Sequence, residues 1–479
     1  MEVTGLTKAP AIDNVEGIVV CTGVEKAGEF SCSDERINRI HDTVLWTQIS
    51  NLHGIPTDCP AREKCGWLGD AQIIAESTIY NFDMALFWEK YLWDIETSRQ
   101  GGMPFDIAPG KRLCSRGIPD WSTAMIQIPW YLYLYYGDVG VLRSHYPGMQ
   151  LVMENFRKRS KDWILYEGRG DWCPPGSIVP VETPMEVTST EYFYLDALIM
   201  ERTAVVLGKE KEAREYTDWK EQIKRSFLRG FYDREKNTYG SQTADSFALY
   251  LGLVPDGMEK VLAASLARDV AVRHNGHAST GITGNKYLYH ALGNYDYGSL
   301  AYHLFRNDSY PGIGYLFSQG ATTLWETWEE TAYSKHYGKD LFRSMNHPMQ
   351  SGFDSWFYQG LAGICPDPEK PGFKGILLKP EIVDEIPAVR ATYRSVYGPV
   401  VSNLTRNGRT LEWEIGIPAN TTAKVFFPVS DPQRITEIAE KNAGDRNPDG
   451  EETEDGRVVW EIGSGKHRYR IALYKVRQE

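Results

Sequence analysis

The segment Thr57–Asp70 holds the densest group of chemically useful side chains in this 479-residue sequence. It reads T-D-C-P-A-R-E-K-C-G-W-L-G-D and supplies three carboxylates, one guanidinium and one indole: Asp58, Glu63, Asp70, Arg62 and Trp67. Because a proline and two glycines interrupt it, we expect a loop that directs several polar side chains towards one point. Convergent carboxylates beside an aromatic ring are what the cleavage of a glycosidic bond requires. The segment therefore predicts part of a glycosidase active site.

A second segment, far along the chain, has matching chemistry. Residues 320–330 read G-A-T-T-L-W-E-T-W-E-E and place Glu326 between Trp325 and Trp328. Indoles stack well on sugar rings, so this carboxylate is a candidate partner for the first segment. Three loop-like stretches add polar and aromatic groups: P-D-W at 119–121, G-D-W-C-P-P at 170–175 and N-H-P at 346–348.

Each candidate side chain also has a purely structural interpretation. Asp58 and Asp70 both stand where they can cap a helix, and Glu63 can be a solvated surface charge. A large helical domain packs many aromatic residues in its core, which is the alternative for five indoles: Trp67, Trp121, Trp172, Trp325 and Trp328. His347, which precedes a proline, also fits a turn residue whose ring bonds the backbone.

The composition excludes several classes of protein. A net charge of −12 without any block of Lys or Arg argues against nucleic acid or an anionic membrane surface as a partner. The seven cysteines form no C-x-x-C pair, which argues against a structural zinc site or a redox motif. Cys59 or Cys65 as a nucleophile is disfavoured because no histidine lies in the same segment. With no signal sequence or long apolar stretch, we expect a cytoplasmic enzyme.

The periodicity divides the chain into three parts. Residues 33–365 show about ten to twelve helical segments at the 3.6-residue period, which suggests a ring of paired helices. In residues 366–479 the apolar residues alternate instead, and Asn407-Gly408 between two such runs predicts a β-hairpin. We expect an antiparallel β-sandwich there, with the polar segment 441–456 as an exposed loop. Residues 1–32 contain the strand-like V-E-G-I-V-V-C-T and are predicted to be an N-terminal β stub.

The motif D-C-P-x-R-E-K-x-G-W-x-G-D at 58–70 resembles the signature of the α-L-rhamnosidases of glycoside hydrolase family 78. The resemblance extends over nearly the whole chain: G-E-F-S-C-S-D-E-R-I-N-R-I-H at 28–41, P-D-W at 119–121, G-D-W at 170–172, A-T-T-L-W-E-T-W at 321–328, S-M-N-H at 344–347, L-A-G-I at 361–364 and I-P-A-N-T-T-A-K-V at 417–425. It implies an (α/α)6 barrel followed by a β-sandwich. It also implies inverting hydrolysis of a terminal α-L-rhamnosyl bond in a rhamnose-containing glycoside, with no metal or cofactor.

The same resemblance implies a role for each candidate residue. Glu63 corresponds to the general acid and Glu326 to the general base. Asp58 and Asp70 correspond to the acids that hold the sugar hydroxyls. The remaining candidates correspond to residues that line the rhamnose pocket: Arg62, Trp67, Trp121, Trp172 and His347. We expect the Arg62 head group to point at the substrate and away from Glu63.

Two alternatives stay open at this point. The same scaffold can act on another deoxy-sugar or on a uronate-containing oligosaccharide. Members of the family carry β-sandwich modules ahead of the barrel, and only residues 1–32 stand in that place here. A carbohydrate-binding form without turnover is therefore the second alternative, although retention of all four acids argues against it. Neither the natural glycoside nor the oligomeric state can be deduced from the sequence.

Overall fold

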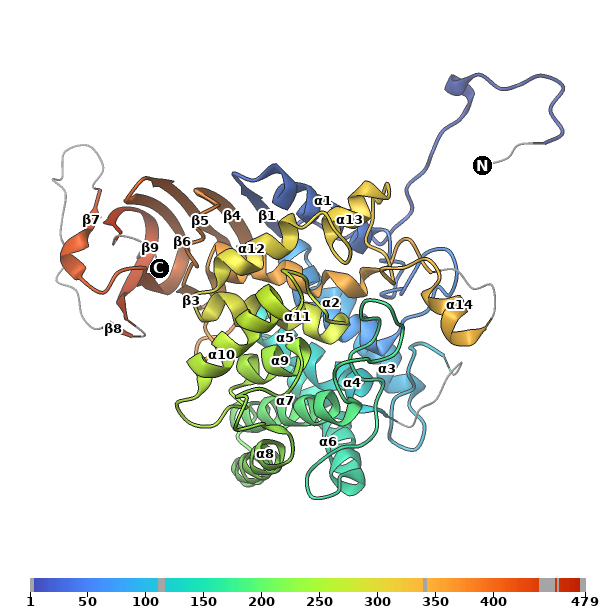
Figure 1. The fold of residues 1–479 in the computed structure, drawn as a ribbon, viewed down its shortest axis with the longest axis horizontal. Helices are drawn as coiled ribbons and strands as arrows, with labels where there is room; N and C mark the ends of the chain where they lie inside the picture. The colour runs from blue at the N-terminus through green and yellow to red at the C-terminus, as the bar shows by residue number, and fades with distance from the viewer. Residues whose placement is uncertain (1–3, 111–116, 339–342, 439–452, 455, 474–479) are drawn as a thin grey trace.

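The computed structural model describes residues 4–110, 117–338, 343–438, 453–454 and 456–473. Figure 1 shows a helical body that carries a β-sheet on one side. The helices are α1 (Glu35–Ile49), α2 (Leu68–Asn81), α3 (Ala85–Ser98), α4 (Pro119–Ser122), α5 (Ala124–Tyr136), α6 (Val139–Arg159), α7 (Met185–Val206), α8 (Glu210–Phe231), α9 (Gln242–Leu251), α10 (Glu259–Arg268), α11 (Ile282–Asn294), α12 (Gly298–Arg306), α13 (Ile313–Ser318) and α14 (Ala332–Tyr337).

The helical body is an (α/α)6 barrel, as expected. Its inner ring runs from α2 through α5, α7, α9 and α11 to a 3₁₀ turn at Pro348–Asp354, which returns to α2. Every residue of α2 is buried, so it has no solvent-facing stripe and occupies the interior. The outer helix α8 instead buries one stripe, which includes Tyr216, Ile223 and Phe227, and its other positions are largely charged.

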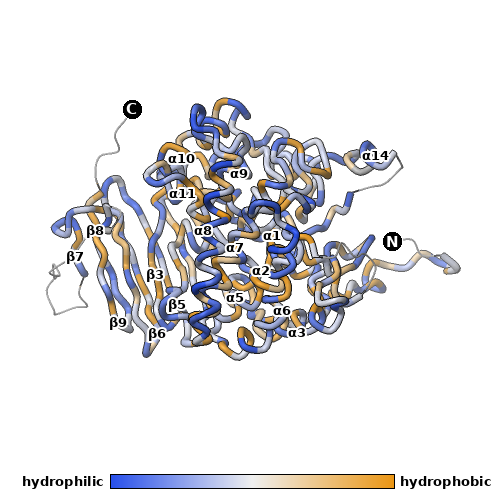
Figure 2. The backbone as a smooth tube through the Cα atoms, turned by 90° about the horizontal axis from the view of Figure 1, so that it is seen from below, coloured by the Kyte–Doolittle hydropathy of each residue, from blue (hydrophilic) through white to orange (hydrophobic). Residues whose placement is uncertain are grey.

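The sheet domain contains nine strands in the described part of the chain: β1 (Gly28–Cys32), β2 (Ile364–Pro366), β3 (Gly375–Leu378), β4 (Ala388–Ser395), β5 (Gly398–Asn407), β6 (Thr410–Phe427), β7 (Ile435–Glu437), β8 (Thr453–Glu454) and β9 (Arg457–Ala472). The strands follow the order β1-β4-β5-β6-β3-β2, and β9 joins β6 to β7 and β8. All pairs are antiparallel except β3 with β6. Hydrophobic and hydrophilic residues alternate along these strands (Figure 2), which places one face on the core.

The predicted hairpin is confirmed, because Asn407 of β5 pairs with Thr410 of β6 and Gly408 between them has a φ of 61°. Most of the segment predicted as an exposed loop, 441–456, lies outside the described residues. None of the described helices is long and apolar enough to cross a membrane.

The N-terminal β element lies at a different place from the one predicted. Residues 15–22 form no strand, and Ile18, Val19 and Val20 are exposed along a segment that runs away from the body (Figure 1). The strand is instead Gly28–Cys32, which pairs antiparallel with β4. β-branched residues favour a strand only where a neighbouring strand is available, and none lies beside residues 15–22 in the described structure.

Candidate active site

One pocket at the mouth of the barrel collects side chains from segments that are far apart in the sequence. It contains about 760 Å³ between protein atoms, including the part open to solvent. Its lining residues are Asp58, Glu63, Trp67, Asp70, Trp121, Arg169, Trp172, Glu326, Tyr337, His347 and Met349. Eight of the nine predicted site residues are therefore brought together here, and the ninth, Arg62, bonds one of them.

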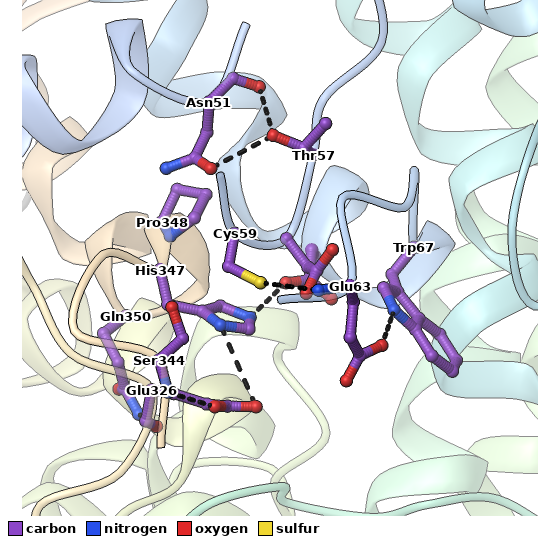
Figure 3. Close-up of polar contacts among 12 residues, drawn as sticks. Asn51, Thr57, Cys59, Glu63, Trp67, Glu326, Ser344, His347, Pro348 and Gln350 are labelled. Carbon is purple, nitrogen blue, oxygen red and sulfur yellow. Dashed lines mark hydrogen bonds and ion pairs between the residues drawn. The ribbon is translucent and has the colours of Figure 1, made fainter. Parts of the chain in front are cut away.

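The loop before α2 is held in shape by its own backbone and side chains. The Asp58 N–H donates to the Cys65 carbonyl oxygen at 2.9 Å, and the Asp58 carboxylate accepts the Cys65 N–H at 2.8 Å. The Cys59 sulfur accepts the Glu63 N–H at 3.3 Å (Figure 3). Asp58 thus closes this loop instead of capping a helix. Asp70 caps no helix either, because α2 begins at Leu68 and Asp70 lies within its first turn.

The Arg62 guanidinium lies between the two candidate catalytic carboxylates. Its Nη2 atom is 2.8 and 2.7 Å from the two oxygens of Glu326 and 3.5 Å from Oε1 of Glu63. The expectation that Arg62 points away from Glu63 is therefore wrong. The Glu326 side chain is only 3% exposed, and a buried carboxylate needs a cation partner, so Arg62 turns towards it.

Each of the two carboxylates has a second anchor. Trp67 donates its indole N–H to Oε2 of Glu63 at 2.8 Å (Figure 3). Glu326 accepts the backbone N–H of Ser344 at 2.8 Å, and its own N–H bonds the Ser344 carbonyl at 2.9 Å. These two hydrogen bonds between residues 326 and 344 direct the Glu326 side chain into the pocket.

His347 is the buried cation at the back of the pocket. Its Nε2 is 2.8 Å from Oδ1 of Asp70, and its Nδ1 is 3.9 Å from Oε1 of Glu326 (Figure 3). Burial opposes the charged imidazolium, but Glu326, the bonded Asp70 and the nearby Asp58 outweigh it and raise the pKa of His347 to about 9. Burial also raises the pKa of Asp58 to about 6, against the attraction of His347.

One described cluster has spacing that suits a metal ion. A carboxylate oxygen of Asp58, the Cys59 sulfur and a ring nitrogen of His347 all lie within 4.8 Å of one another. His347 already supplies positive charge there, so a metal would have to displace its proton.

Arg169 is a pocket residue that the sequence reasoning missed. Its guanidinium carbon lies 5.4, 5.7 and 5.8 Å from the ring centroids of Trp121, Trp67 and Trp172. It also bonds the Asp106 carboxylate at 2.9 Å. The three predicted indoles are thus gathered around one cation. The only sequence signal for Arg169 is its position directly before G-D-W. Tyr337 and Met349 also line the pocket and were also missed, because no sequence pattern marks them.

The segment that carries Arg169 is fixed by two buried aspartates. Oδ2 of Asp120 accepts the backbone N–H groups of Arg169 and Gly170, each at 2.6 Å. Burial raises the pKa of Asp120 to about 7, although these hydrogen bonds oppose the shift. Asp171 accepts three backbone N–H groups at the start of α11: Gly281 at 2.6 Å, Thr283 at 3.0 Å and Gly284 at 3.1 Å.

Asp171→Ala is expected to lower the free energy of unfolding by about 2–4 kcal/mol, because it leaves several buried N–H groups at a helix N-terminus unpaired. Thr243→Val is the matched control, since it removes only the hydroxyl that Asp171 also accepts and should cost about 1 kcal/mol. Urea unfolding of both variants measures the difference. Equal losses in the two variants would contradict the capping role of Asp171.

Gly69 leaves the space that the Trp121 ring occupies. A Cβ atom at this position would overlap the six-membered part of that indole. Gly69→Ala is therefore expected to displace Trp121 and to lower the unfolding free energy by about 1–3 kcal/mol. Gly230→Ala in α8 is the control, because its Cβ meets nothing and alanine favours the helix by up to about 1 kcal/mol. Thermal unfolding of the two variants should move in opposite directions.

The fold and the pocket together place the chain among the six-hairpin glycosidase domains. The family described as bacterial alpha-L-rhamnosidase six-hairpin glycosidase domain matches residues 25–361, and the bacterial alpha-L-rhamnosidase C-terminal domain matches residues 363–442. The chain belongs to the bacterial alpha-L-rhamnosidase family.

Named relatives agree with this assignment. An alpha-L-rhamnosidase of Formosa agariphila is 34% identical over 89% of this chain and 46% of its own length, and one of Streptomyces avermitilis is 31% identical over 98% and 44%. The solved alpha-L-rhamnosidase from Dictyoglumus thermophilum superposes with a TM-score of 0.89 at 35% identity, over 98% of this chain and 53% of that one. The Streptomyces avermitilis enzyme complexed with L-rhamnose gives 0.84 at 30% identity, over 95% and 43%. The chain thus spans about half the length of the relatives it matches.

Proposed function

We propose that this chain hydrolyses terminal α-L-rhamnosyl bonds with inversion of configuration. The observation that carries the proposal is the placement of Glu63 and Glu326, which face one pocket from separate segments and share one guanidinium nitrogen. Inverting glycosidases need an acid and a base on opposite sides of the anomeric carbon, with room for a water molecule. The family membership supports the choice of rhamnose, and the bound L-rhamnose in the Streptomyces avermitilis structure agrees with it.

In this proposal Glu63 protonates the leaving oxygen as the glycosidic bond breaks. Glu326 takes a proton from the water that attacks the anomeric carbon from the opposite face. The Trp67 indole and the Ser344 N–H hold these two carboxylates in their positions. Arg62 keeps the Glu326 carboxylate oriented, because its Nη2 bonds both carboxylate oxygens. Positioned acid and base groups each contribute about 10²–10⁴-fold to the rate.

The other pocket residues bind the sugar. Asp58, Asp70 and His347 form a polar floor that suits hydroxyl groups. Three indoles and one methionine form an apolar wall that suits the methyl group of a 6-deoxy sugar: Trp67, Trp121, Trp172 and Met349. The cation among these indoles, Arg169, already bonds the Asp106 carboxylate at 2.9 Å.

The direct test is hydrolysis of an aryl α-L-rhamnoside, followed by NMR from the first minutes. We expect β-L-rhamnose to appear before mutarotation, since inversion changes the anomer. Initial release of the α-anomer would contradict inversion, and hydrolysis of an aryl α-L-fucoside or a glycuronide instead of the rhamnoside would change the substrate class. If calorimetry shows that L-rhamnose binds but no rhamnoside is hydrolysed, the protein is a carbohydrate-binding protein and not a hydrolase.

A further inference from the structure

The end of helix α1 supports the segment that carries the candidate acid. Asn51 lies just beyond the last turn of this helix and is 1% exposed. Its backbone carbonyl accepts the Thr57 N–H at 2.9 Å. The Thr57 hydroxyl lies 3.1 Å from this carbonyl oxygen and 3.1 Å from the Asn51 side-chain oxygen (Figure 3). Asn51 therefore holds the loop of Glu63 at the point where that loop begins.

The amide nitrogen of the same side chain reaches the support of the candidate base. It donates to the side-chain oxygen of Asn346 at 2.7 Å and to the Thr47 carbonyl at 2.9 Å. The Asn346 N–H donates to the Ser344 hydroxyl at 3.3 Å, and this hydroxyl donates to the Asn346 carbonyl at 2.9 Å. Ser344 in turn fixes Glu326 through two backbone hydrogen bonds. One buried amide thus joins the supports of the acid and the base.

Helix α1 also braces the base-bearing side by a second contact. The Thr47 hydroxyl oxygen accepts the Leu324 N–H at 2.9 Å. The Leu324 carbonyl then accepts the His347 N–H at 2.9 Å. Residues 324–326 and 344–347 are therefore bonded to each other, and both rest on the end of α1. The position of this unit relative to the acid-bearing loop is set where Asn51 meets Thr57.

Two other links between the same segments are charged and lie at the pocket. Arg62 bonds Glu326 at 2.7 Å, and the Arg62 side chain is 32% exposed. His347 bonds Asp70 at 2.8 Å, and both of these residues line the pocket. Substrate hydroxyl groups and solvent compete for such links. The side chain of Asn51 is neutral, buried and not part of the pocket lining, so a bound sugar leaves its hydrogen bonds in place.

We propose that Asn51 is a positioning residue that sets the separation between the Glu63 and Glu326 carboxyl groups. The proposal rests on the proposed inverting hydrolysis, in which a water molecule must fit between the base and the anomeric carbon. A misplacement of about 1 Å costs about 10²-fold in rate. Binding of the sugar in the ground state does not require both carboxyl groups at their reacting distances, whereas the transition state does. The loss therefore falls on kcat more than on KM.

Two substitutions cut this link from its two ends. Asn51→Ala removes the bridging amide, and Thr57→Val removes the hydroxyl that meets it. Both leave the backbone hydrogen bond between the two residues in place. Thr57→Val also keeps the shape of the side chain, so it tests the link even where Asn51→Ala does not fold. Thr57→Ser is the conservative variant, because it retains the hydroxyl.

Asn81→Ala is the matched control. Asn81 is 0% exposed, and its amide nitrogen also makes two hydrogen bonds, to Gln48 at 2.9 Å and to Asp354 at 2.8 Å. It ends α2, about 16 Å along the helix from Asp70. Asn81→Ala thus removes a buried amide of the same kind without touching the acid-bearing loop or the base-bearing unit. Thermal unfolding of all variants shows that the stability losses are comparable.

We expect Asn51→Ala to lower kcat by about 10²-fold and Thr57→Val by about tenfold, with less than about threefold change in KM. The double variant should be no slower than Asn51→Ala alone, because both changes cut the same link. Thr57→Ser and Asn81→Ala should keep kcat within about threefold of the wild type. Unchanged kcat in Asn51→Ala and Thr57→Val, multiplied losses in the double variant, or an equal loss in Asn81→Ala overturns the positioning role.

Crystal structures of the wild type and Thr57→Val give a readout that does not depend on turnover. The separation between the carboxyl carbons of Glu63 and Glu326 should differ by about 1 Å between them. An unchanged separation overturns the proposal. If the wild type hydrolyses no rhamnoside, the proposed function fails, and a changed separation alone still supports the positioning role of Asn51.

Discussion

Glu63→Gln is expected to lower kcat/KM by about 10³-fold for an alkyl α-L-rhamnoside and by far less for an aryl rhamnoside with an acidic phenol. An alkoxide leaves only when it is protonated, whereas an acidic phenol leaves without that help. Glu326→Gln should lower the rate by a similar large factor for both substrates, because every leaving group requires the same activated water. The two variants therefore distinguish the acid from the base by their dependence on the leaving group.

Glu330→Gln is the matched control for this pair, because it makes the same chemical change on an exposed carboxylate four residues from Glu326. Its activity should stay within twofold of the wild type. Initial rates measured on a series of aryl and alkyl rhamnosides give the comparison directly. The role assignment would be reversed if Glu326→Gln were the variant whose loss depended on the leaving group.

His347→Gln is expected to lower the free energy of unfolding at pH 6 by about 3–5 kcal/mol and to impair catalysis as well. The variant removes the imidazolium that Asp58, Asp70 and Glu326 surround, so buried carboxylates lose their partner. The pKa of His347 is raised to about 9 from an ordinary value of 6.5. A raised pKa means that the folded state binds the proton more tightly, so this contribution is complete below pH 6.5 and declines until about pH 9.

The measurement is urea unfolding of the wild type and the variant from pH 6 to pH 9.5. The gap in unfolding free energy between them should narrow by about 3 kcal/mol over this range. His303→Gln is the control, because His303 also pairs with a carboxylate, Glu385, but is 61% exposed. Its effect should be below about 1 kcal/mol at every pH. A gap for His347→Gln that stays constant with pH would contradict the buried imidazolium.

The sequence predicted a ring of paired helices and the acidic loop because their signals are local, and the resemblance to the α-L-rhamnosidases supplied the (α/α)6 barrel and the residues that line the pocket. The helical periodicity marks the paired helices, and the broken segment at 58–70 indicates a loop with convergent acids. The predictions that failed concern side-chain contacts between segments that only the folded structure brings together. The direction of Arg62 depends on how deeply Glu326 is buried, and Glu326 lies in a different segment. Arg169 joins the site only because three indoles from three segments surround it.

The same reasoning explains the misplaced N-terminal strand. Val19 and Val20 satisfy the propensity for a strand, but Gly28–Cys32 lies beside β4 and forms the pairs. The division into domains at residues 1–32, 33–365 and 366–479 stays a prediction. β1 shows why domain boundaries are difficult to predict from the sequence alone. A strand that precedes the barrel belongs to the sheet that follows it.

That strand also sets the order of events when the chain is made. The ribosome releases Gly28–Cys32 early, yet the partner residues Val389–Tyr393 emerge only after the whole barrel has been synthesised. Until then the N–H and C=O groups of β1 have no strand to pair with, and they form an open edge on a nascent chain. The pairing of β1 with β4 therefore has to wait until the barrel has been synthesised. Its rate decides how long that edge is open to association with other chains.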